Sequence, residues 1–264
     1  MANEYQAKPL PVWLGMVTSI LMWCIVICAT VVLFLAGLIF FFPVSLLIRD
    51  ERRLMHLVAR AWGWISLALV PIWSLKIEGL ENLDRKKTYV IVGNHQSLVD
   101  ILVSLASLPL QFKFISKKSI LSIPFLGWHM ALAGYIPLDR GSRESAKKVM
   151  AKAAHYLDKG VGVLFFPEGT RSLDGEIHTF KTGAFRLAAD HDIEILPVVI
   201  DGTGEALPKH NWYAKNTSFF ILSVGKPVRI SSKSAEDIDS AAESIRGEMS
   251  SRLHALRKRL GVTR

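Results

Sequence analysis

The feature that most constrains this chain is an apolar segment at residues 9–48, which contains no Asp, Glu, Lys, Arg or His. A helix needs about 20 apolar residues to cross the hydrocarbon core of a bilayer, and this segment has roughly twice that number. A cleaved signal peptide does not fit, because the apolar region is too long and no small-residue cleavage site follows a short core. We therefore expect a membrane anchor, either one long tilted span or two shorter helices that turn back near Gly37 or Pro43.

Charged residues flank this anchor unequally. Glu4 and Lys8 precede it, whereas Arg49, Arg52 and Arg53 follow it. Positive residues favour the cytoplasmic side, so the rest of the chain is expected in the cytoplasm, at the inner (cytoplasmic) membrane. Over the whole chain 32 Lys and Arg outnumber 23 Asp and Glu, for a formal net charge of +9. Beside an anchor this surplus favours an anionic bilayer and anionic substrates over nucleic acid, for which no recognisable module is seen.

Residues 53–75 predict a helix at the membrane surface. Trp62, Trp64 and Trp73 favour this position, because indole rings prefer the level of the lipid headgroups. The alternative is a helix buried in the folded domain, with its tryptophans in the core. Pro71 is expected to bend or end the helix.

From residue 76 onward, short apolar runs alternate with helical stretches, which is typical of a sheet built from βαβ units. We expect the α/β class, with a mixed sheet flanked by helices and preceded by an N-terminal hydrophobic helical membrane anchor. The expected division is an anchoring segment at 1–75 and an α/β domain at 76–264. Strands are expected at residues 89–92, 113–116, 134–138, 162–166, 195–200 and 219–224, with a short continuation at 228–230. Helices are expected after Asp100, over 142–159, from about 182 and over 234–260.

The last of these helices, 234–260, ends in three basic residues. Ser234 can cap its start, with Asp237 three residues further on. Arg257, Lys258 and Arg259 complement the helix dipole at the other end, and could also touch lipid headgroups. A solvated basic face is the simpler interpretation.

Residues 94–100, NHQSLVD, follow one apolar run and precede another, a pattern that indicates a strand, a turn and a helix start. Within one regular helix His95 and Asp100 would diverge by roughly 140° and could not meet. They could meet if His95 lies in the turn and Asp100 reaches back. The carboxylate would then fix the tautomer of the imidazole, which could act as a general base. The alternative is a polar turn residue followed by an ordinary acidic residue of a first helical turn.

A second polar block, FFPEGTRS at residues 165–172, follows a predicted buried strand. In open α/β sheets ligands bind outside the carboxyl ends of strands, so Glu168 and Arg171 lie where functional residues are expected. Gly169 permits close approach of the backbone, and the guanidinium of Arg171 can hold a phosphate through two parallel hydrogen bonds. The alternative is an exposed Glu168–Arg171 ion pair that closes a surface turn.

Between these blocks, Lys117, Lys118 and Arg140 lie near the ends of predicted strands and would add positive charge to a shared cleft. Residues 120–132 are apolar and aromatic with almost no charge, which is consistent with a wall for an acyl chain or a surface that rests on the bilayer. For each residue taken singly, packing in the core is the simpler explanation.

Four short blocks, taken together, resemble a known enzyme family. Residues 94–100 look like the NHX4D box of the glycerolipid acyltransferases, and residues 134–140 resemble their second block. FPEGTRS at 166–172 matches their third block, and LPVVI at 196–200 is similar to their fourth, proline-containing strand. The blocks follow the family's order across roughly residues 76–230, which is far more specific than any one box. By size and by its layout of one anchor and one domain, the chain most resembles the bacterial 1-acylglycerol-3-phosphate acyltransferases.

The resemblance implies transfer of an acyl group from acyl-CoA or acyl-carrier protein to the free hydroxyl of lysophosphatidic acid, giving phosphatidic acid. It implies that His95 deprotonates the hydroxyl, that Asp100 orients His95, and that Glu168 and Arg171 belong to the site for the acceptor's phosphate. Lys117 aligns with a lysine of a family segment, although Ser119 stands where many members carry Glu. The implied substrate-binding residues are Asn94, Lys117, Arg140, Glu168, Gly169, Thr170 and Arg171.

An alcohol that attacks a thioester must lose its proton, and the developing oxyanion must be stabilised. His95 can do the first, and backbone N–H groups of the turn around it are one possible source of the second. No serine lies in a Gly-x-Ser-x-Gly context and no cysteine lies outside the apolar segment, so direct transfer is simpler than an acyl-enzyme. His95 and Asp100 lack the further ligands of a zinc site, so no metal is expected, and no cofactor beyond the acyl donor.

Two alternatives stay open at this point. The acceptor could be glycerol-3-phosphate, another lysophospholipid or a lyso-aminolipid. A protein of another class, a non-catalytic membrane lipid-binding protein, could also keep this fold, although the intact pair of His95 and Asp100 argues against it.

Overall fold

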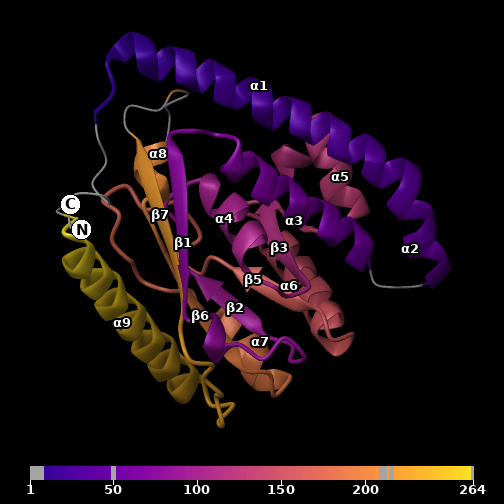
Figure 1. Cartoon of the computed structure of the whole chain (residues 1–264). Helices are drawn as coiled ribbons and strands as arrows, with labels where there is room; N and C mark the ends of the chain where they lie inside the picture. Colours follow the sequence, from indigo (N-terminus) through magenta and orange to yellow (C-terminus); the bar gives the residue numbers. More distant parts are fainter. Residues whose placement is uncertain (1–8, 49–51, 208–212, 214–216, 263–264) are drawn as a thin grey trace.

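A computed structural model describes residues 9–48, 52–207, 213 and 217–262, and these residues contain a seven-stranded sheet (Figure 1). The strand order is β1-β7-β6-β2-β5-β3-β4, and every neighbouring pair is parallel except β6 and β7. The expected α/β class with a mixed sheet is therefore confirmed. The strands are β1 (Trp73–Glu78), β2 (Val90–Gly93), β3 (Phe112–Lys117), β4 (Ile136–Leu138), β5 (Gly162–Phe165), β6 (Ile195–Asp201) and β7 (Ser218–Val224).

The sheet departs from the sequence-based expectation at three places. Strand β1 was not expected, and the predicted division between residues 75 and 76 falls inside it. Strand β4 begins at Ile136 rather than at 134, because Gly134 has a φ of 76°, a left-handed conformation that a strand does not contain. The expected continuation at 228–230 is reduced to a single bridge between Val228 and Ile195.

Helices cover both faces of the sheet, because the strand residues point alternately to one face and the other. In β2, for example, Ile91 packs into one core while Val90 and Val92 pack into the opposite core. The first face is covered by α3 (Arg53–Ala68), α4 (Val99–Ser107) and the short α5 (Leu126–Leu132). The second face is covered by α6 (Arg143–Asp158), α7 (Gly183–Asp190) and α9 (Ala235–Leu260).

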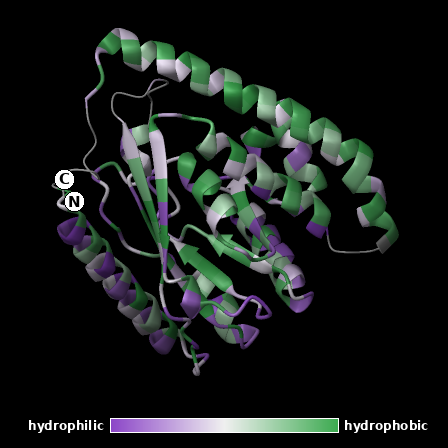
Figure 2. Ribbon diagram, in the orientation of Figure 1, coloured by the Kyte–Doolittle hydropathy of each residue, from purple (hydrophilic) through white to green (hydrophobic). Residues whose placement is uncertain are grey.

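The apolar N-terminal segment is one continuous helical rod. Helix α1 (Val12–Ala36) passes through a π-helical turn (Gly37–Phe41) into α2 (Phe42–Ile48), so the chain does not turn back at Gly37. Its 36 residues from Val12 to Leu47 are long and apolar enough to cross a membrane. At about 1.5 Å per residue they extend about 54 Å, well beyond a hydrocarbon core of about 30 Å. The N-terminal helix thus suggests association with a membrane, and the ribbon in Figure 2 is mostly green, the colour of hydrophobic residues, along this helix.

This rod also packs on the α/β domain, where it lies across α3 and α5 (Figure 1). The indole N–H of Trp62 in α3 donates to the Thr30 hydroxyl of α1 at 2.9 Å. The ring of Phe34 contacts those of Phe125 and Trp128, with centroids 5.7 and 5.9 Å apart. The apolar helix is therefore part of the folded structure as well as a candidate anchor.

Helix α3 has features of both alternatives considered for residues 53–75, an interfacial helix and a helix buried in the domain. It ends at Ala68, before Pro71, as expected. Trp64 is exposed, as an interfacial helix requires, but the opposite face of α3 packs so closely on α4 that a Cβ at Gly63 would lie 2.9 Å from the Leu102 carbonyl oxygen. The interfacial assignment of Trp73 is wrong, because this residue belongs to β1 and its buried ring packs edge-on against Phe220.

Candidate active site

Two of the sequence blocks meet beyond the carboxyl ends of β2 and β5. These strands are parallel neighbours, so the segments that follow them emerge side by side. A backbone hydrogen bond joins the two segments, with the Ser172 N–H donating to the His95 carbonyl at 2.7 Å. On the other side, the Asn94 side chain exchanges two hydrogen bonds of 2.8 Å with the backbone of Ile200 in β6. The turn after β2 is thus held from both neighbouring strands.

His95 and Asp100 make the contact that the turn geometry predicts. His95 lies in the turn, Asp100 lies in the first turn of α4, and the carboxylate reaches back to the imidazole. The Nδ1–H of His95 donates to Asp100 Oδ2 at 2.6 Å. An ionised carboxylate only accepts hydrogen bonds, so Nδ1 carries the proton and Nε2 remains the basic nitrogen.

Asp100 is fully buried, and its oxygens accept three hydrogen bonds besides that of the imidazole. Oδ2 accepts the backbone N–H groups of Gln96 at 2.7 Å and Ser97 at 2.9 Å. Oδ1 accepts the hydroxyl of Thr203 at 2.5 Å. Thr203 begins α8 (Thr203–Ala206) just after β6, so a third strand end contributes to the site. These donors fix the carboxylate, and through it the orientation of the imidazole ring.

The imidazole of His95 is held on its face as well as at its edge. Its ring stacks on Phe166 with centroids 4.3 Å apart and an interplanar angle of 18°. Its side chain is 12% exposed, and no residue in the described part of the chain hydrogen-bonds Nε2. Because His95 lines a cavity, described below, this nitrogen is available to a substrate there. The arrangement can accept a proton from a bound hydroxyl.

Glu168 braces the turn and does not pair with Arg171. Its two oxygens accept the backbone N–H groups of His95 at 3.0 Å and His178 at 3.3 Å. Burial raises the pKa of the Glu168 carboxyl, against the opposing effect of these hydrogen bonds. Among the residues that the structure describes, Arg171 makes no ion pair, so the surface pair considered for this block does not form.

The backbone N–H groups around His95 are already used. Those of Gln96 and Ser97 donate to Asp100, that of His95 donates to Glu168, and that of Val99 donates to the Ser97 hydroxyl. An oxyanion hole needs donors that are free to meet the developing charge. These four N–H groups, which belong to the turn considered as one possible source of oxyanion donors, are therefore engaged within the protein.

A cavity of about 450 Å³ opens from the site into the layer between the sheet and the N-terminal helix. Its polar end is lined by His95, Lys117, Arg140 and Arg171, which come from the ends of four different strands (β2, β3, β4 and β5) and the loops that follow them. Three of these four side chains carry a positive charge. The end of the cavity that contains the imidazole can therefore attract an anionic group such as a phosphate.

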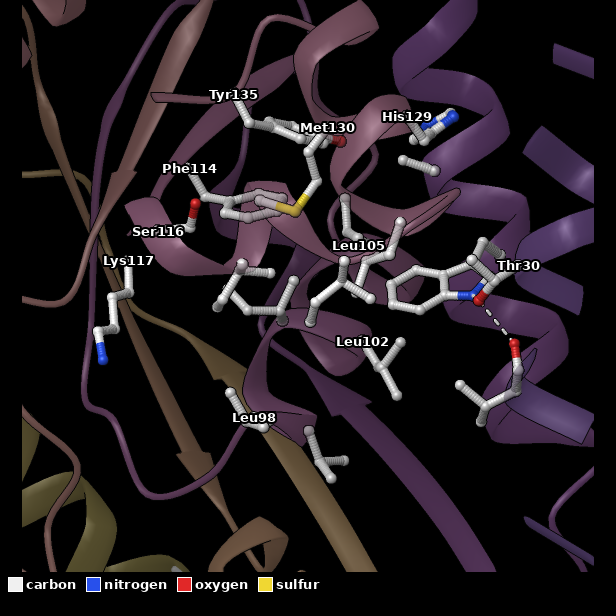
Figure 3. A pocket seen from close by; sticks show the side chains of 18 of the residues that line it. Thr30, Leu98, Leu102, Leu105, Phe114, Ser116, Lys117, His129, Met130 and Tyr135 are labelled. Atoms are coloured by element: carbon white, nitrogen blue, oxygen red, sulfur yellow. Dashed lines mark hydrogen bonds between the residues drawn. The ribbon is translucent and has the colours of Figure 1, made fainter. Parts of the chain in front are cut away.

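The rest of the cavity is apolar and is bounded by α1, α3, α4 and α5. Figure 3 shows Leu98, just before α4, and Leu102 and Leu105 of α4 along this space, with Phe114 and Met130 opposite and Lys117 at one side. The expected apolar wall within residues 120–132 is present. Its lining residues are Ile120, Ile123, Leu126, His129 and Met130. A cavity of this character suits a hydrocarbon chain.

Several residues that the blocks implied for substrate binding lie outside the cavity lining. Asn94 and Glu168 are engaged with backbone groups, as described above. Gly169 and Thr170 form an exposed turn, in which Gly169 has a φ of 75° that favours glycine. The structure thus places Lys117, Arg140 and Arg171 in the lining of the same cavity as His95, whereas the other four lie outside that lining.

Three contacts of the site were not found from the sequence. Phe166 stands inside a block that was recognised, but its stacking on His95 depends on the two strand ends being adjacent. Thr203 follows a glycine at the end of β6, which gives no specific signal. Gln96 lies within the first block, and its side chain points away from the cavity to Gly175 and Asp201.

Comparison with known proteins agrees with this geometry. A family model described as Acyltransferase matches residues 74–201. The chain is 34% identical to the 1-acyl-sn-glycerol-3-phosphate acyltransferase of Saccharomyces cerevisiae over 227 residues, which are 83% of this chain and 74% of the yeast protein. It is 40% identical over 179 residues to the chloroplastic 1-acyl-sn-glycerol-3-phosphate acyltransferase LPAT1 of Arabidopsis thaliana, covering 67% of this chain.

A solved structure shares the whole architecture. The crystal structure of the 1-acyl-sn-glycerophosphate acyltransferase PlsC from Thermotoga maritima superposes with a TM-score of 0.75 at 28% identity, covering 91% of this chain and 96% of that one. The chain spans about half the length of the plant and algal relatives that it matches. With four blocks, one cavity and these relatives in agreement, the chain belongs to the 1-acyl-sn-glycerol-3-phosphate acyltransferase family.

Proposed function

We propose that this protein transfers an acyl group to the free hydroxyl of 1-acyl-sn-glycerol 3-phosphate, giving phosphatidic acid. One observation carries the proposal: the basic nitrogen of His95 and the guanidinium of Arg171 line the same cavity, whose interior is apolar. A lysophosphatidic acid has the matching parts, a hydroxyl, a phosphate and a hydrocarbon chain. The names of the relatives support the same substrate.

In the proposed reaction, Nε2 of His95 takes the proton of the acceptor hydroxyl while its oxygen attacks the thioester carbonyl of the donor. A C–O bond forms, the C–S bond then breaks, and the thiolate leaves and is protonated by the imidazolium. Asp100 keeps Nδ1 protonated and stabilises the positive ring in between. No side chain is acylated in this scheme.

Arg171 is the principal candidate for the acceptor's phosphate, because it lines the cavity and makes no ion pair within the described residues. A planar guanidinium can bind two phosphate oxygens at once. Lys117 and Arg140 contribute further positive charge at the same end. Asn94 and Glu168 support the site through the backbone groups that they bind, and Gly169 and Thr170 form the exposed turn between Glu168 and Arg171.

The proposed donor is acyl-CoA or acyl-carrier protein, and no other cofactor enters the scheme. The proposed location is the inner (cytoplasmic) membrane with the α/β domain in the cytoplasm, which the basic residues after the N-terminal helix support. A domain held at the lipid surface can take up the acceptor without extracting its chain into water, which would expose apolar area at roughly 25 cal/mol per Å².

The test is an assay of thiol release by the purified full chain with a panel of acceptors and both donor types. Lysophosphatidic acid should be used in preference to glycerol-3-phosphate, other lysophospholipids and lyso-aminolipids. The variant His95→Ala should lose at least about 10²-fold in kcat, since a general base contributes about 10² to 10⁴. The control His191→Ala removes a half-buried imidazole that lies outside the cavity and pairs with Asp158, and it should retain activity. Full turnover by His95→Ala would contradict the assignment of the base.

A further inference from the structure

The last helix delivers a buried arginine to the back of the active site. Arg257 belongs to the stripe of α9 that faces the sheet, four residues after the buried Leu253, and it is only 6% exposed. The solvated basic face expected for residues 257–259 is therefore wrong for Arg257. Arg259, two residues later, is exposed and pairs with Glu78. Arg257 does not line the cavity, so it has no access to a substrate there.

The guanidinium of Arg257 is fully engaged by acceptors from two segments. Its Nε and Nη2 each donate to a carboxylate oxygen of Asp201 at 3.2 Å. Nη1 donates to Glu176 Oε1 at 2.6 Å, and Nη2 also donates to the Gly175 carbonyl at 2.7 Å. Asp201 is the last residue of β6, whereas Gly175 and Glu176 lie in the loop that follows Arg171. One side chain thus ties the end of a central strand to that loop.

The same acceptors lead to the base. The side-chain amide of Gln96 donates to both the Gly175 carbonyl and Asp201 Oδ1 at 3.2 Å. The backbone N–H of Gln96 donates to the Asp100 carboxylate, which in turn orients His95. Asp201 also precedes Thr203 by two residues, and Thr203 donates to the other oxygen of Asp100. Two short routes therefore connect Arg257 with the carboxylate that holds the imidazole.

Stability alone is a weak explanation for this arrangement. A buried ion pair loses much of its Coulomb energy to the desolvation of both charges, and apolar side chains of similar size often stabilise a core equally well. What an apolar residue could not do is hold four acceptor atoms in fixed directions. The position of those acceptors relative to His95 is what the guanidinium determines.

We propose that Arg257 is a positioning residue for acyl transfer, which fixes the turn of His95 and the loop of Arg171 relative to one another. This inference rests on the proposed function. Small displacements of reacting groups by a distant substitution can cost about 10²-fold in rate. The loss should appear in kcat, because proton transfer and attack depend on alignment.

The first test compares Arg257→Gln with the matched control Arg259→Gln, which removes an exposed arginine of the same helix. Activity is normalised to the folded fraction, which is measured by thermal unfolding followed by tryptophan fluorescence. We expect kcat of Arg257→Gln to fall by about 10²-fold and that of Arg259→Gln to stay within about twofold of the wild type. A folded Arg257→Gln protein with the kcat of the control would overturn the proposal.

The second test is Gln96→Met, which cuts the link to the turn but leaves the ion pairs of Arg257 intact. We expect a lower kcat for Gln96→Met. In the double variant Gln96→Met/Arg257→Lys, the fold-loss in kcat should be smaller than the product of the fold-losses of the two single variants. The single variant Gln96→Met tests the positioning role even if Arg257→Gln does not fold. An unchanged kcat in Gln96→Met would then overturn that role. A wild-type protein inactive towards lysophosphatidic acid would instead contradict the proposed function.

Discussion

The two ends of the cavity are built in different ways. At the polar end, loops at the carboxyl ends of β2, β5 and β6 hold His95 and Asp100 through hydrogen bonds with defined directions. At the apolar end, helices α1, α3, α4 and α5 meet through side-chain packing, with few polar contacts such as that of Trp62 with Thr30. Hydrogen bonds fail when an atom is misplaced, whereas packing adjusts to changes in shape. Substitutions at the polar end should therefore stop the reaction, and those at the apolar end should change which chain is accepted.

The largest effect is expected for Asp100→Asn. The amide keeps the size of the side chain but replaces one acceptor oxygen by a donor, which cannot accept the bonds now made by His95, Gln96 and Ser97 or by Thr203. The imidazole then loses the partner that fixes its tautomer, a change that can cost on the order of 10³-fold or more in kcat. Steady-state assays with Asp158→Asn as the exposed control check this result. A kcat near that of the control would show that the polar end is less strictly arranged than the geometry indicates.

Arg171→Ala comes next. A charge-assisted hydrogen bond contributes about 1.5–3 kcal/mol, so the KM for lysophosphatidic acid should rise by roughly 10-fold to 10²-fold while kcat changes less. A monoacylglycerol, which has the chain and the hydroxyl but no phosphate, provides the internal control. The variant and the wild type should use this neutral acceptor equally poorly. If the KM for the phosphorylated acceptor does not change, the phosphate binds elsewhere.

At the apolar end, Leu102→Phe should alter selectivity more than rate. Leu102 lines the middle of the cavity (Figure 3), and a larger side chain there shortens the space for a hydrocarbon. Each methylene displaced from burial costs about 0.8 kcal/mol, or roughly fourfold in relative kcat/KM. The measurement is the ratio of kcat/KM for long and short chains. The chain length is varied first in the donor and then in the acceptor, which shows which of the two chains this end holds. Leu57→Phe, on the exposed side of α3, is the control. Identical ratios in both variants would mean that neither substrate chain binds in this part of the cavity.

The smallest effect on activity, but a clear one on stability, is expected from two buried histidines, His129 in the cavity lining and His56 outside it. Burial lowers the pKa of His56 to about 3, with the charge of Lys113 acting in the same direction, and burial lowers the pKa of His129 to about 4. Both pKa values lie below the ordinary 6.5, so the unfolded chain binds more protons in this window. The free energy of unfolding should be highest above pH 6.5 and fall as the pH drops towards 4.

Unfolding midpoints measured from pH 7 to pH 4.5 check this dependence. His129→Leu should flatten the curve, because it removes one of the two groups that must take up a proton. His191→Gln, which changes an imidazole outside this cluster, should leave the slope as it is in the wild type. An equal slope in all three proteins would mean that other groups cause the loss of stability.

The sequence predicted the contact between His95 and Asp100 because these two residues are close in the chain. His95 and Asp100 are five residues apart, and the strand, turn and helix that bring them together can be read from neighbouring residues. Strand β1 was missed although Trp73, Leu75 and Ile77 alternate with polar residues, because the preceding helix and the tryptophans favoured a membrane interpretation. The alternation of apolar and polar residues that indicates a strand was present, but the helical, tryptophan-rich pattern before it was given more weight.

The contacts that were missed join distant segments. Arg257 lies more than 50 residues after Asp201 in the chain, and no spacing rule links a basic residue near the end of a helix to the end of a strand. Glu168 was assigned with Arg171 to the site of the acceptor's phosphate. Its carboxylate binds the backbone of His95, because the parallel pairing of β2 and β5 places that turn within its reach. Such contacts depend on the order of strands in the sheet, which local sequence patterns do not contain.

Because α1 packs on the domain, it cannot be removed or exchanged without changing the cavity. Met22, Trp23, Val26 and Phe34 of this helix form one wall of the cavity, opposite residues of α3 and α4. Removal of residues 9–48 by a protease, or their exchange for an unrelated anchor, would therefore leave an open groove in place of a closed cavity. The same helix would therefore serve both for attachment and for closing the cavity. A shorter, water-soluble form of the protein would need other residues to replace this wall of the cavity before it could hold a lipid.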